Sequence, residues 1–483
     1  MAISYQSNSR RFIGMAGVVI ISATFAILSG VLSATGKGIV VASVAAGLLA
    51  IALIIICLAT PLIGFYATTV LSFLSFEPGR ILDRPIPVYT SIEIYILLVF
   101  LGASWQTRRE KGNLWSAPIS IAFFCYGIFF LVEFFNPNMD SISGYVLYAR
   151  KFLMFVFVYV TAYKVLDTKE KVKYFFEFWI IISFVTAIFG CFQQWFGLLP
   201  YEMHAILSDP HEYKLLLQGG MIRKFSILSD PVSFGILCGT MSLYSLIMAI
   251  HEKGRNRKIL YSIITFFLVL GMLYSGTRTT IIILPSGMVL YGLMTLHNRR
   301  TLIIVFSFFT ISTAVLLAPI DSPALNRMRS SLNLKEASLD VRTVHRKYIQ
   351  PYIHYHPLGG GIATSGVDGI RFNPHHVLAG FPPDSGLLKY AIETGWIGYA
   401  LVMAFFFIIL VQGINYYFLA TDPEMKLYLL ALTVTLFTII ISQYAQVSLG
   451  QIPGVLFFYS GLAILKRLLE FSNGNENEIN VET

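Results

Sequence analysis

Side chains that could bind an anion gather in two polar segments of a chain that is otherwise strongly apolar. Arg223 closes the first polar segment, about residues 197–223, and Arg342 lies within the second, about residues 320–386. Arg278 stands in "YSGTRTT", between two apolar runs. A guanidinium offers a planar fork of donors that binds carboxylate or phosphate in a bidentate manner. These three arginines are therefore candidates for holding an anionic ligand.

Each arginine also has a purely structural interpretation. An unpaired guanidinium within a bilayer costs about 3 kcal/mol even on the mild insertion scale, so Arg278 either snorkels to the interface or holds a ligand. Arg342 opens an amphipathic stretch and also suits a solvated helix face. Arg223 precedes "SILSDPVSFG", in which Asp230 and Pro231 are typical of a helix start, and also suits a salt bridge.

Groups that could accept a proton lie in the second polar segment. Asp384 stands in "PPDSGLLKYAIETGWIGY", where a polar turn leads into an apolar run. His375 and His376 stand just upstream in "NPHHVLAG", and histidine accepts protons near neutral pH. Asp384 or Ser385 also suits the N-cap of a helix that begins near Leu387. The sequence leaves open which of these groups acts as a base.

A metal or cofactor site is not predicted. Seven of the nine histidines fall in the two polar segments, and none is spaced as in a known metal motif: His204, His211, His345, His354, His356, His375 and His376. "PLGGGIATSG" offers the N–H groups of Gly359, Gly360 and Gly361 as an anion-binding nest, and a plain glycine-rich turn fits equally. The sequence therefore predicts no metal ion and no organic cofactor.

Apolar runs long enough to cross a bilayer surround these segments. The chain of 483 residues is 56% hydrophobic and 13% charged, which predicts an all-α, polytopic membrane protein in contact with the lipid bilayer. The apolar runs are continuous rather than alternating, which argues against a β-barrel. The net charge of +9 resides in short loops and requires no nucleic-acid partner. The four cysteines lie in apolar runs and form no disulfide or metal pattern.

About fourteen transmembrane spans are predicted. They lie near residues 12–33, 38–59, 61–75, 88–106, 116–135, 145–163, 175–196, 225–250, 259–275, 279–297, 302–319, 387–413, 427–446 and 452–466. Short basic connections such as "HEKGRNRK" all fall on one side, which the positive-inside rule makes cytoplasmic, so both termini are predicted there. The large polar segment before the last three spans then lies outside the cytoplasm.

The predicted domain organisation follows from these spans. A transmembrane region covers 1–319, a large extracytoplasmic loop with part of the functional site covers 320–386, C-terminal transmembrane helices cover 387–470, and a disordered cytoplasmic tail covers 471–483.

Three blocks around the candidate residues resemble the O-antigen ligase and polysaccharide polymerase family of bacterial membrane glycosyltransferases. The blocks are "MIRKFSILSDPVSFG", "LYSGTRTTIIIL", and "VRTVHRKYIQPYIHYHPLGGGIATSG" with its return "PPDSGLLKYAIETGWIGY". The likeness covers about residues 220–400. Many ligases of the family carry a histidine where this chain has Asp384, and aspartate there is similar to polymerase-like members.

The resemblance implies an enzyme of the bacterial inner (plasma) membrane that assembles surface polysaccharide or exopolysaccharide of the cell envelope. It would take a glycan from a polyprenyl (undecaprenyl) diphosphate and transfer it to a hydroxyl of an acceptor glycan at the outer face. The three arginines would then stabilise the departing diphosphate, and one of the three candidate bases would take the hydroxyl proton. Other polysaccharide-assembly proteins are candidate partners. Polymerisation is favoured over ligation.

The competing interpretation is a transporter or flippase of lipid-linked or polar solutes. A transporter places ionisable side chains near the bilayer midplane. Here the main interior candidates are Arg150 and Lys151, which Glu133 is expected to face, and most other charge lies at the outer ends. The distribution of charge therefore favours the enzyme.

Overall fold

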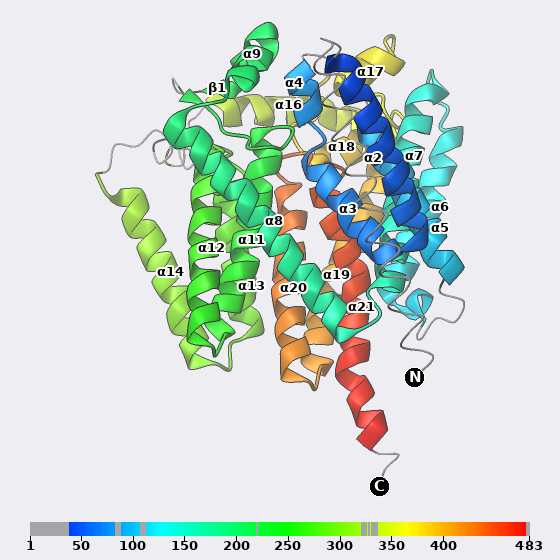
Figure 1. Ribbon diagram of the computed structural model, residues 1–483. Helices are drawn as coiled ribbons and strands as arrows, with labels where there is room; N and C mark the ends of the chain where they lie inside the picture. The colour runs from blue at the N-terminus through cyan, green and yellow to red at the C-terminus, as the bar shows by residue number, and fades with distance from the viewer. Residues whose placement is uncertain are drawn as a thin grey trace.

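The computed structural model describes residues 38–82, 88–106, 113–218, 221–319, 326, 329 and 337–479, and it consists almost wholly of helices (Figure 1). The long helices are α2 (Gly38–Ala59), α3 (Pro61–Phe73), α5 (Val88–Gln106), α6 (Pro118–Val132), α7 (Ile142–Val165), α8 (Lys169–Phe196), α11 (Pro231–His251), α12 (Arg255–Tyr274), α13 (Thr280–Met294), α14 (Arg299–Leu317), α16 (Ala337–Tyr355), α19 (Gly395–Leu419), α20 (Pro423–Ser442) and α21 (Gly454–Ile479).

Shorter elements connect these helices. They are α4 (Glu77–Leu82), η1 (Leu114–Ser116), η2 (Glu133–Phe135), α9 (Pro200–Ser208), α10 (Pro210–Leu216), α17 (Gly366–Phe372) and α18 (Gly386–Glu393), with a hairpin of β1 (Leu217–Gln218) and β2 (Met221–Ile222). The two strands pair antiparallel, with Leu217 opposite Ile222.

The predicted polytopic membrane protein is confirmed at the level of its helices. Within the described residues, eight helices are long and apolar enough to cross a membrane: α6 with η2, α7, α8, α11, α12, α14, α19 and α20. Shorter apolar helices at 47–59, 61–73 and 282–294 add to them. Every predicted span from 38–59 onward coincides with one long helix, except 387–413, which covers two helices. The first predicted span, 12–33, lies outside the described residues. The total of fourteen stays a prediction.

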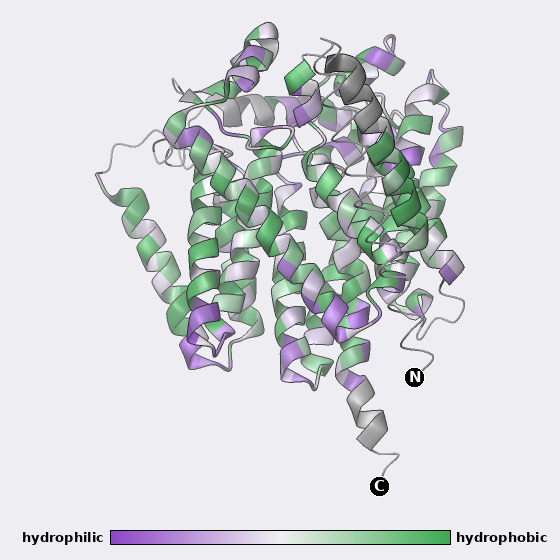
Figure 2. Cartoon of the chain, in the orientation of Figure 1, coloured by the Kyte–Doolittle hydropathy of each residue, from purple (hydrophilic) through white to green (hydrophobic). Residues whose placement is uncertain are grey.

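Helix α11 forms the centre of the bundle. Its candidate span is 89% buried, compared with 6% for α14, which lies at the edge of the bundle in Figure 1. Aromatic stacking joins α11 to its neighbours, because the ring of Phe176 in α8 lies 5.1 Å from that of Tyr244 in α11 and 5.4 Å from that of Tyr428 in α20. Figure 2 shows hydrophobic residues over the sides of the helices and hydrophilic residues toward their ends, as a bilayer requires.

The two ends of the bundle differ. Helices α4, α9, α16 and α17 lie at one end, which we call the loop end, and the C-terminus lies at the other (Figure 1). The basic connections gather at the second end, where Lys169 pairs with Asp422 at 2.9 Å and Lys173 with Glu424 at 2.8 Å. The described parts of the two predicted outer segments thus lie at one end and the described basic connections at the other, whereas the orientation of the chain and the large loop of 320–386 stay predictions.

We expect the loop end to face outward. Val367 in α17 is 81% exposed at the loop end, and Asn256 in α12 is exposed at the other end. In a background with the exposed Cys125 replaced by serine, Val367→Cys should react with an impermeant maleimide in cells whose outer barrier is opened. Asn256→Cys should react only after the membrane is permeabilised. The opposite pattern would reverse the topology and the proposals built on it.

Two predicted boundaries are placed differently. The predicted span 387–413 is two helices, α18 and α19, and the candidate span begins at Gly395. Gly395 has a φ of +65°, and a Cβ there would overlap the carbonyl of Pro357, so only glycine fits this break. At the C-terminus, α21 continues to Ile479, through most of the predicted disordered tail.

The interior charges have other partners than predicted. Arg150 Nε in α7 lies 2.5 Å from Glu93 Oε2 in α5. Glu133 instead accepts a hydrogen bond from Asn136 Nδ2 at 2.8 Å, so the predicted contact between Glu133 and Arg150 is wrong. Lys151 lies over the rings of Tyr89 and Tyr148, at 5.2 and 4.8 Å from their centres.

Candidate functional site

Asp384 lies at the loop end, directly before α18. The N-cap of α18 is Ser385, whose Oγ accepts a hydrogen bond from Leu388 N at 3.1 Å. Asp384 is therefore not needed as a cap, and its Oδ2 lies 2.9 Å from Nδ1 of His345 in α16. A carboxylate at this distance accepts the Nδ1–H of a neutral imidazole, which leaves the Nε2 lone pair as the acceptor. We call this pair the His345–Asp384 dyad.

The dyad is partly open to solvent. The side chains are 29% exposed for His345 and 19% for Asp384, so a substrate can reach them. The ring of Phe381 lies 5.6 Å from the imidazole. Arg346, next in α16, lies over the ring of Tyr444 and donates to its hydroxyl at 3.2 Å. An aromatic and cationic surface therefore flanks the dyad.

Arg342 belongs to the same helix as His345. It precedes His345 by three residues, a spacing that places the two positions on one face of α16. The side chain of Arg342 lies outside the described part of the structure. The backbone alone therefore brings one predicted arginine position beside the dyad.

The two predicted histidine bases lie apart from Asp384. His375 is exposed. His376 Nδ1 accepts from Leu378 N at 3.1 Å, and burial lowers the pKa of His376. Neither histidine contacts Asp384 within the described residues. Sequence reasoning grouped His345 only with the other loop histidines, although its place in "VRTVHRK", one turn after Arg342, could have indicated it.

The three glycines do not form the predicted anion-binding nest. Their N–H groups already donate to carbonyls, Gly359 to His356, Gly360 to Ile392 and Gly361 to Glu393, each at 2.9 Å. No N–H of this turn is left for an anion. The turn instead fastens the chain to the end of α18, and the plain glycine-rich turn is the better interpretation.

Arg223 lies against the turn that carries Arg278. Arg223 Nε donates to Ser275 O at 3.0 Å, and its Nη2 donates to Thr277 Oγ1 at 2.8 Å. Thr277 Oγ1 in turn donates to Pro231 O at 2.9 Å, at the start of α11. These bonds join Arg223, the turn between α12 and α13 that carries Arg278, and the start of α11. We call Arg223, Arg278 and this turn at the loop end the arginine unit.

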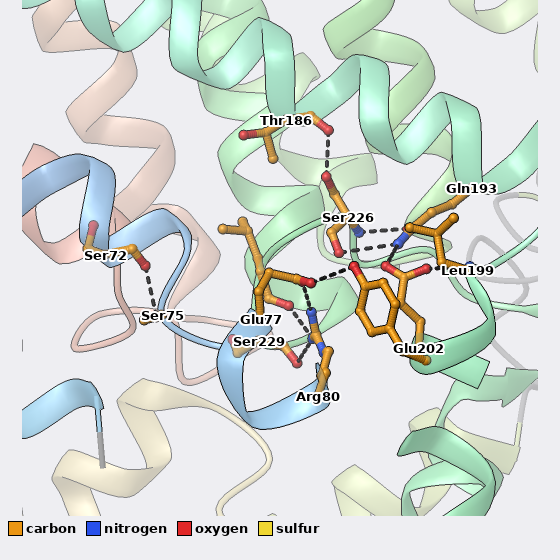
Figure 3. A network of polar contacts seen from close by, with 12 residues as sticks. Ser72, Ser75, Glu77, Arg80, Thr186, Gln193, Leu199, Glu202, Ser226 and Ser229 are labelled. Carbon is orange, nitrogen blue, oxygen red and sulfur yellow. Dashed lines mark hydrogen bonds and ion pairs between the residues drawn. The ribbon is translucent and has the colours of Figure 1, made fainter. Parts of the chain in front are cut away.

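A buried polar network holds the segment that follows Arg223 (Figure 3). Ser226, at a φ of 56°, donates its N–H to Gln193 Oε1 at 2.9 Å and its Oγ–H to Thr186 O at 2.6 Å. Gln193 Nε2 donates to Glu202 Oε1 at 2.8 Å. These bonds fix the end of α8, α9 and the chain beside Arg223 together.

Arg80 in α4 extends this network to the start of α11. It pairs with Glu77 at 2.8 Å and donates to the carbonyls of Leu228 and Ser229 (Figure 3). Tyr201 in α9 donates to Glu77 Oε2 at 2.8 Å. These contacts join α4 and α9 to the chain that leads from Arg223 to the start of α11.

A cavity of about 270 Å³ lies between α6, α7, α18, the segment that joins α20 to α21, and α21. Gly386, two residues after Asp384, lines it. Lys389 Nζ donates to Tyr148 OH at 2.6 Å, and Tyr148 donates to Asp368 Oδ2 at 2.5 Å. This chain of hydrogen bonds joins α7, α17 and α18.

Glu393 closes the polar wall of the cavity. It lies 3.8 Å from Lys389 Nζ and accepts from Ser365 Oγ at 2.5 Å. Burial raises the pKa of Glu393, against the opposing effects of Lys389 and Ser365. From the sequence, no role was assigned to Lys389 or Glu393, although two opposite charges four residues apart on an apolar helix are a signal for a buried pair.

The class of protein follows from these observations: a polytopic helical membrane protein with a partly open His–Asp dyad, an arginine unit and a cavity at one end. Residues 263–403 match the family model described as O-antigen ligase. This segment contains Arg278, Arg342, His345 and Asp384, and the match confirms the predicted resemblance to that family. It supports a membrane enzyme of glycosyl transfer, of the ligase or polymerase kind. No curated protein matches the chain.

Proposed function

We propose that the protein is a glycosyltransferase that takes a glycan from a polyprenyl diphosphate and transfers it to a sugar hydroxyl at the outer face of the bacterial inner membrane. The observation that carries this proposal is the His345–Asp384 dyad, because it supplies a positioned base inside the segment that matches the O-antigen ligase family. The donor and the acceptor are lipid-linked or free glycans of surface polysaccharide assembly.

The reaction needs one base and one electrostatic clamp. The acceptor oxygen forms a bond to the anomeric carbon while the bond from that carbon to the diphosphate oxygen breaks, and its electron pair leaves with the diphosphate. His345 Nε2 takes the hydroxyl proton, and Asp384 stabilises the imidazolium that forms. Arg278, with Arg342 and Arg223, balances the charge on the departing diphosphate. Arginines carry the positive charge in this proposal, so it includes no metal.

Polymerisation is the form of the reaction that we favour. Asp384 occupies the place where many ligases of the family carry histidine, and here the imidazole comes from α16 instead. The dyad therefore differs in its chain order from the ligase pattern. The products of cells that lack the protein separate the two activities, since loss of long chains indicates a polymerase and loss of attachment indicates a ligase.

A transporter is the weaker proposal. The main support for a transporter is the interior charge of α7, but Arg150 forms an ion pair with Glu93. A paired charge lowers the cost of burial without requiring a solute path.

Purified protein in detergent should transfer glycan from a polyprenyl diphosphate donor, extracted from cells that lack the protein, to an added acceptor. Detergent removes any gradient, so the reaction does not depend on transport. Gel electrophoresis should show longer or newly attached glycan. Absence of transfer by protein that restores polysaccharide when returned to the cells would contradict an enzymatic role.

A further inference from the structure

The cavity between α6, α7 and α18 combines apolar faces with unused hydrogen-bonding groups. The hydroxyls of three lining tyrosines make no hydrogen bond within the described part of the chain: Tyr126, Tyr390 and Tyr459. Phenylalanine rings complete the wall: Phe130, Phe152 and Phe155. Tyrosine hydroxyls that find no protein partner in such a place are suited to a polar ligand with an apolar side.

Charged and amide side chains add further donors. Lys389 has three N–H donors, and its described hydrogen bond, to Tyr148, uses one of them. Gln451, which lines the cavity, accepts from Ser233 Oγ at 2.7 Å through its carbonyl oxygen, and its amide group carries two further N–H donors. The cavity therefore offers hydroxyl, ammonium and amide groups from three different elements.

The composition of the wall selects among possible ligands. A lipid tail would leave these polar groups unpaired, which is costly in a buried site. A diphosphate would meet the carboxylate of Glu393, which lines the cavity and lies 3.8 Å from Lys389 Nζ. A pyranose ring meets both requirements, because its C–H faces pack on aromatic rings and its hydroxyls donate and accept. The volume of about 270 Å³ is near the lower end of small-molecule pockets, roughly 300–1,000 Å³.

We propose that this cavity binds one sugar ring of the donor or the acceptor glycan, with Tyr390, Lys389 and Gln451 on its hydroxyls. The proposal rests on the proposed glycosyl transfer and adds a saccharide subsite to it. Gly386 lines the cavity and follows Asp384 by two residues, so the chain leads directly from the dyad to the cavity wall. A side chain at Gly386 would overlap Gln443 Oε1, and glycine therefore lets α18 pack closely at this edge.

Protection of an engineered cysteine tests the subsite directly. Val447→Cys places a thiol on the cavity wall, and Val367→Cys, exposed on α17, is the matched control. Both are made in the Cys125→Ser background, since the other native thiols are buried. The probes are free glucose, galactose, mannose, rhamnose, N-acetylglucosamine and glucuronic acid. A sugar at about ten times its Kd should slow maleimide labelling of the cavity thiol about tenfold and leave the control unchanged.

A hydroxyl deletion then links protection to the wall of the cavity. Tyr390→Phe keeps the ring and removes one partner, so protection by the same sugar should weaken several-fold. Tyr355→Phe, on the exposed side of α16, should leave protection unchanged. If Val447→Cys does not fold, Leu449→Cys, which also lines the cavity, replaces it. Labelling that no sugar slows in either thiol variant overturns the proposal.

Kinetics identify the source of the sugar and separate this proposal from the proposed function. In Tyr390→Phe, a higher KM for the lipid-linked donor assigns the subsite to the donor, and a higher KM for the acceptor assigns it to the acceptor. Glycan transfer by the wild type without sugar protection rejects the subsite alone. Sugar protection without any transfer rejects the proposed glycosyl transfer and leaves a saccharide-binding membrane protein.

Discussion

Replacing His345 by glutamine should lower the rate of glycan transfer by about 10²–10⁴-fold, the usual contribution of a general base. Glutamine can still donate a hydrogen bond to Asp384 across the 2.9 Å gap, so the junction of α16 and α18 should keep its structure. It cannot accept the hydroxyl proton. The measurement is the initial rate of transfer by purified protein, with the thermal unfolding midpoint recorded for each variant.

Asp384 provides the second half of the same test. Asp384→Asn keeps the size of the side chain and removes the charge that stabilises an imidazolium, so transfer should again fall by orders of magnitude with little loss of stability. Combined with His345→Gln, it should add little further loss, because residues that act as a unit are not additive. Independent, multiplying losses would mean that the two residues do not act as a dyad.

Ser385→Ala is the control that separates capping from chemistry. Ser385 caps α18, so its loss should lower the free energy of unfolding by about 1 kcal/mol. The rate of transfer below the unfolding transition should change little. Full activity of Asp384→Asn would remove the dyad from the reaction. Where Asp384→Asn loses activity, Asp384→His shows whether an imidazole at the family's usual place restores transfer.

The helices could be predicted from the sequence because a bilayer imposes a simple rule. Continuous apolar runs must satisfy their backbone internally, so each predicted span from 38–59 onward is a helix. The rule fails at 387–413, where hydropathy continues through Gly395 although the backbone turns there with a positive φ. Apolar composition alone does not register such a break, since it depends on the contact with Pro357.

The candidate site was predictable only in part. Its location at the loop end follows from charge and span order, and Asp384 was named. Its partner, His345, comes from 39 positions earlier in the chain, and although the spacing from Arg342 marks His345 as a candidate, no local pattern pairs it with Asp384. The glycine turn shows the reverse error. The sequence predicted that its N–H groups could bind an anion, but in the fold they donate to the carbonyls of His356, Ile392 and Glu393. Contacts between residues far apart in the sequence determine both the pairing of His345 with Asp384 and the hydrogen bonds of the glycine turn.

The predicted arginines, Arg278 in the arginine unit and Arg342 in α16, give the second large effect. Arg278→Ala and Arg342→Ala should each lower glycan transfer by about 10²–10³-fold, as the loss of one charge-stabilising donor does in other enzymes. Arg278→Lys should restore only part of the rate, because an ammonium lacks the planar fork that binds a diphosphate at two oxygens. The protein should still insert and fold, which size-exclusion chromatography and the unfolding midpoint report.

Arg223 should behave differently from Arg278. Its side chain supports the turn at Ser275 and Thr277, so Arg223→Ala should lower both transfer and stability, and Arg223→Lys should restore stability more than transfer. Arg300→Ala, on an exposed arginine at the opposite end, is the matched control and should keep full activity. Full activity in both Arg278→Ala and Arg342→Ala would rule out these arginines as the clamp on the leaving diphosphate. The charge would then have to come from Arg346, which follows His345 in α16 and donates to the hydroxyl of Tyr444.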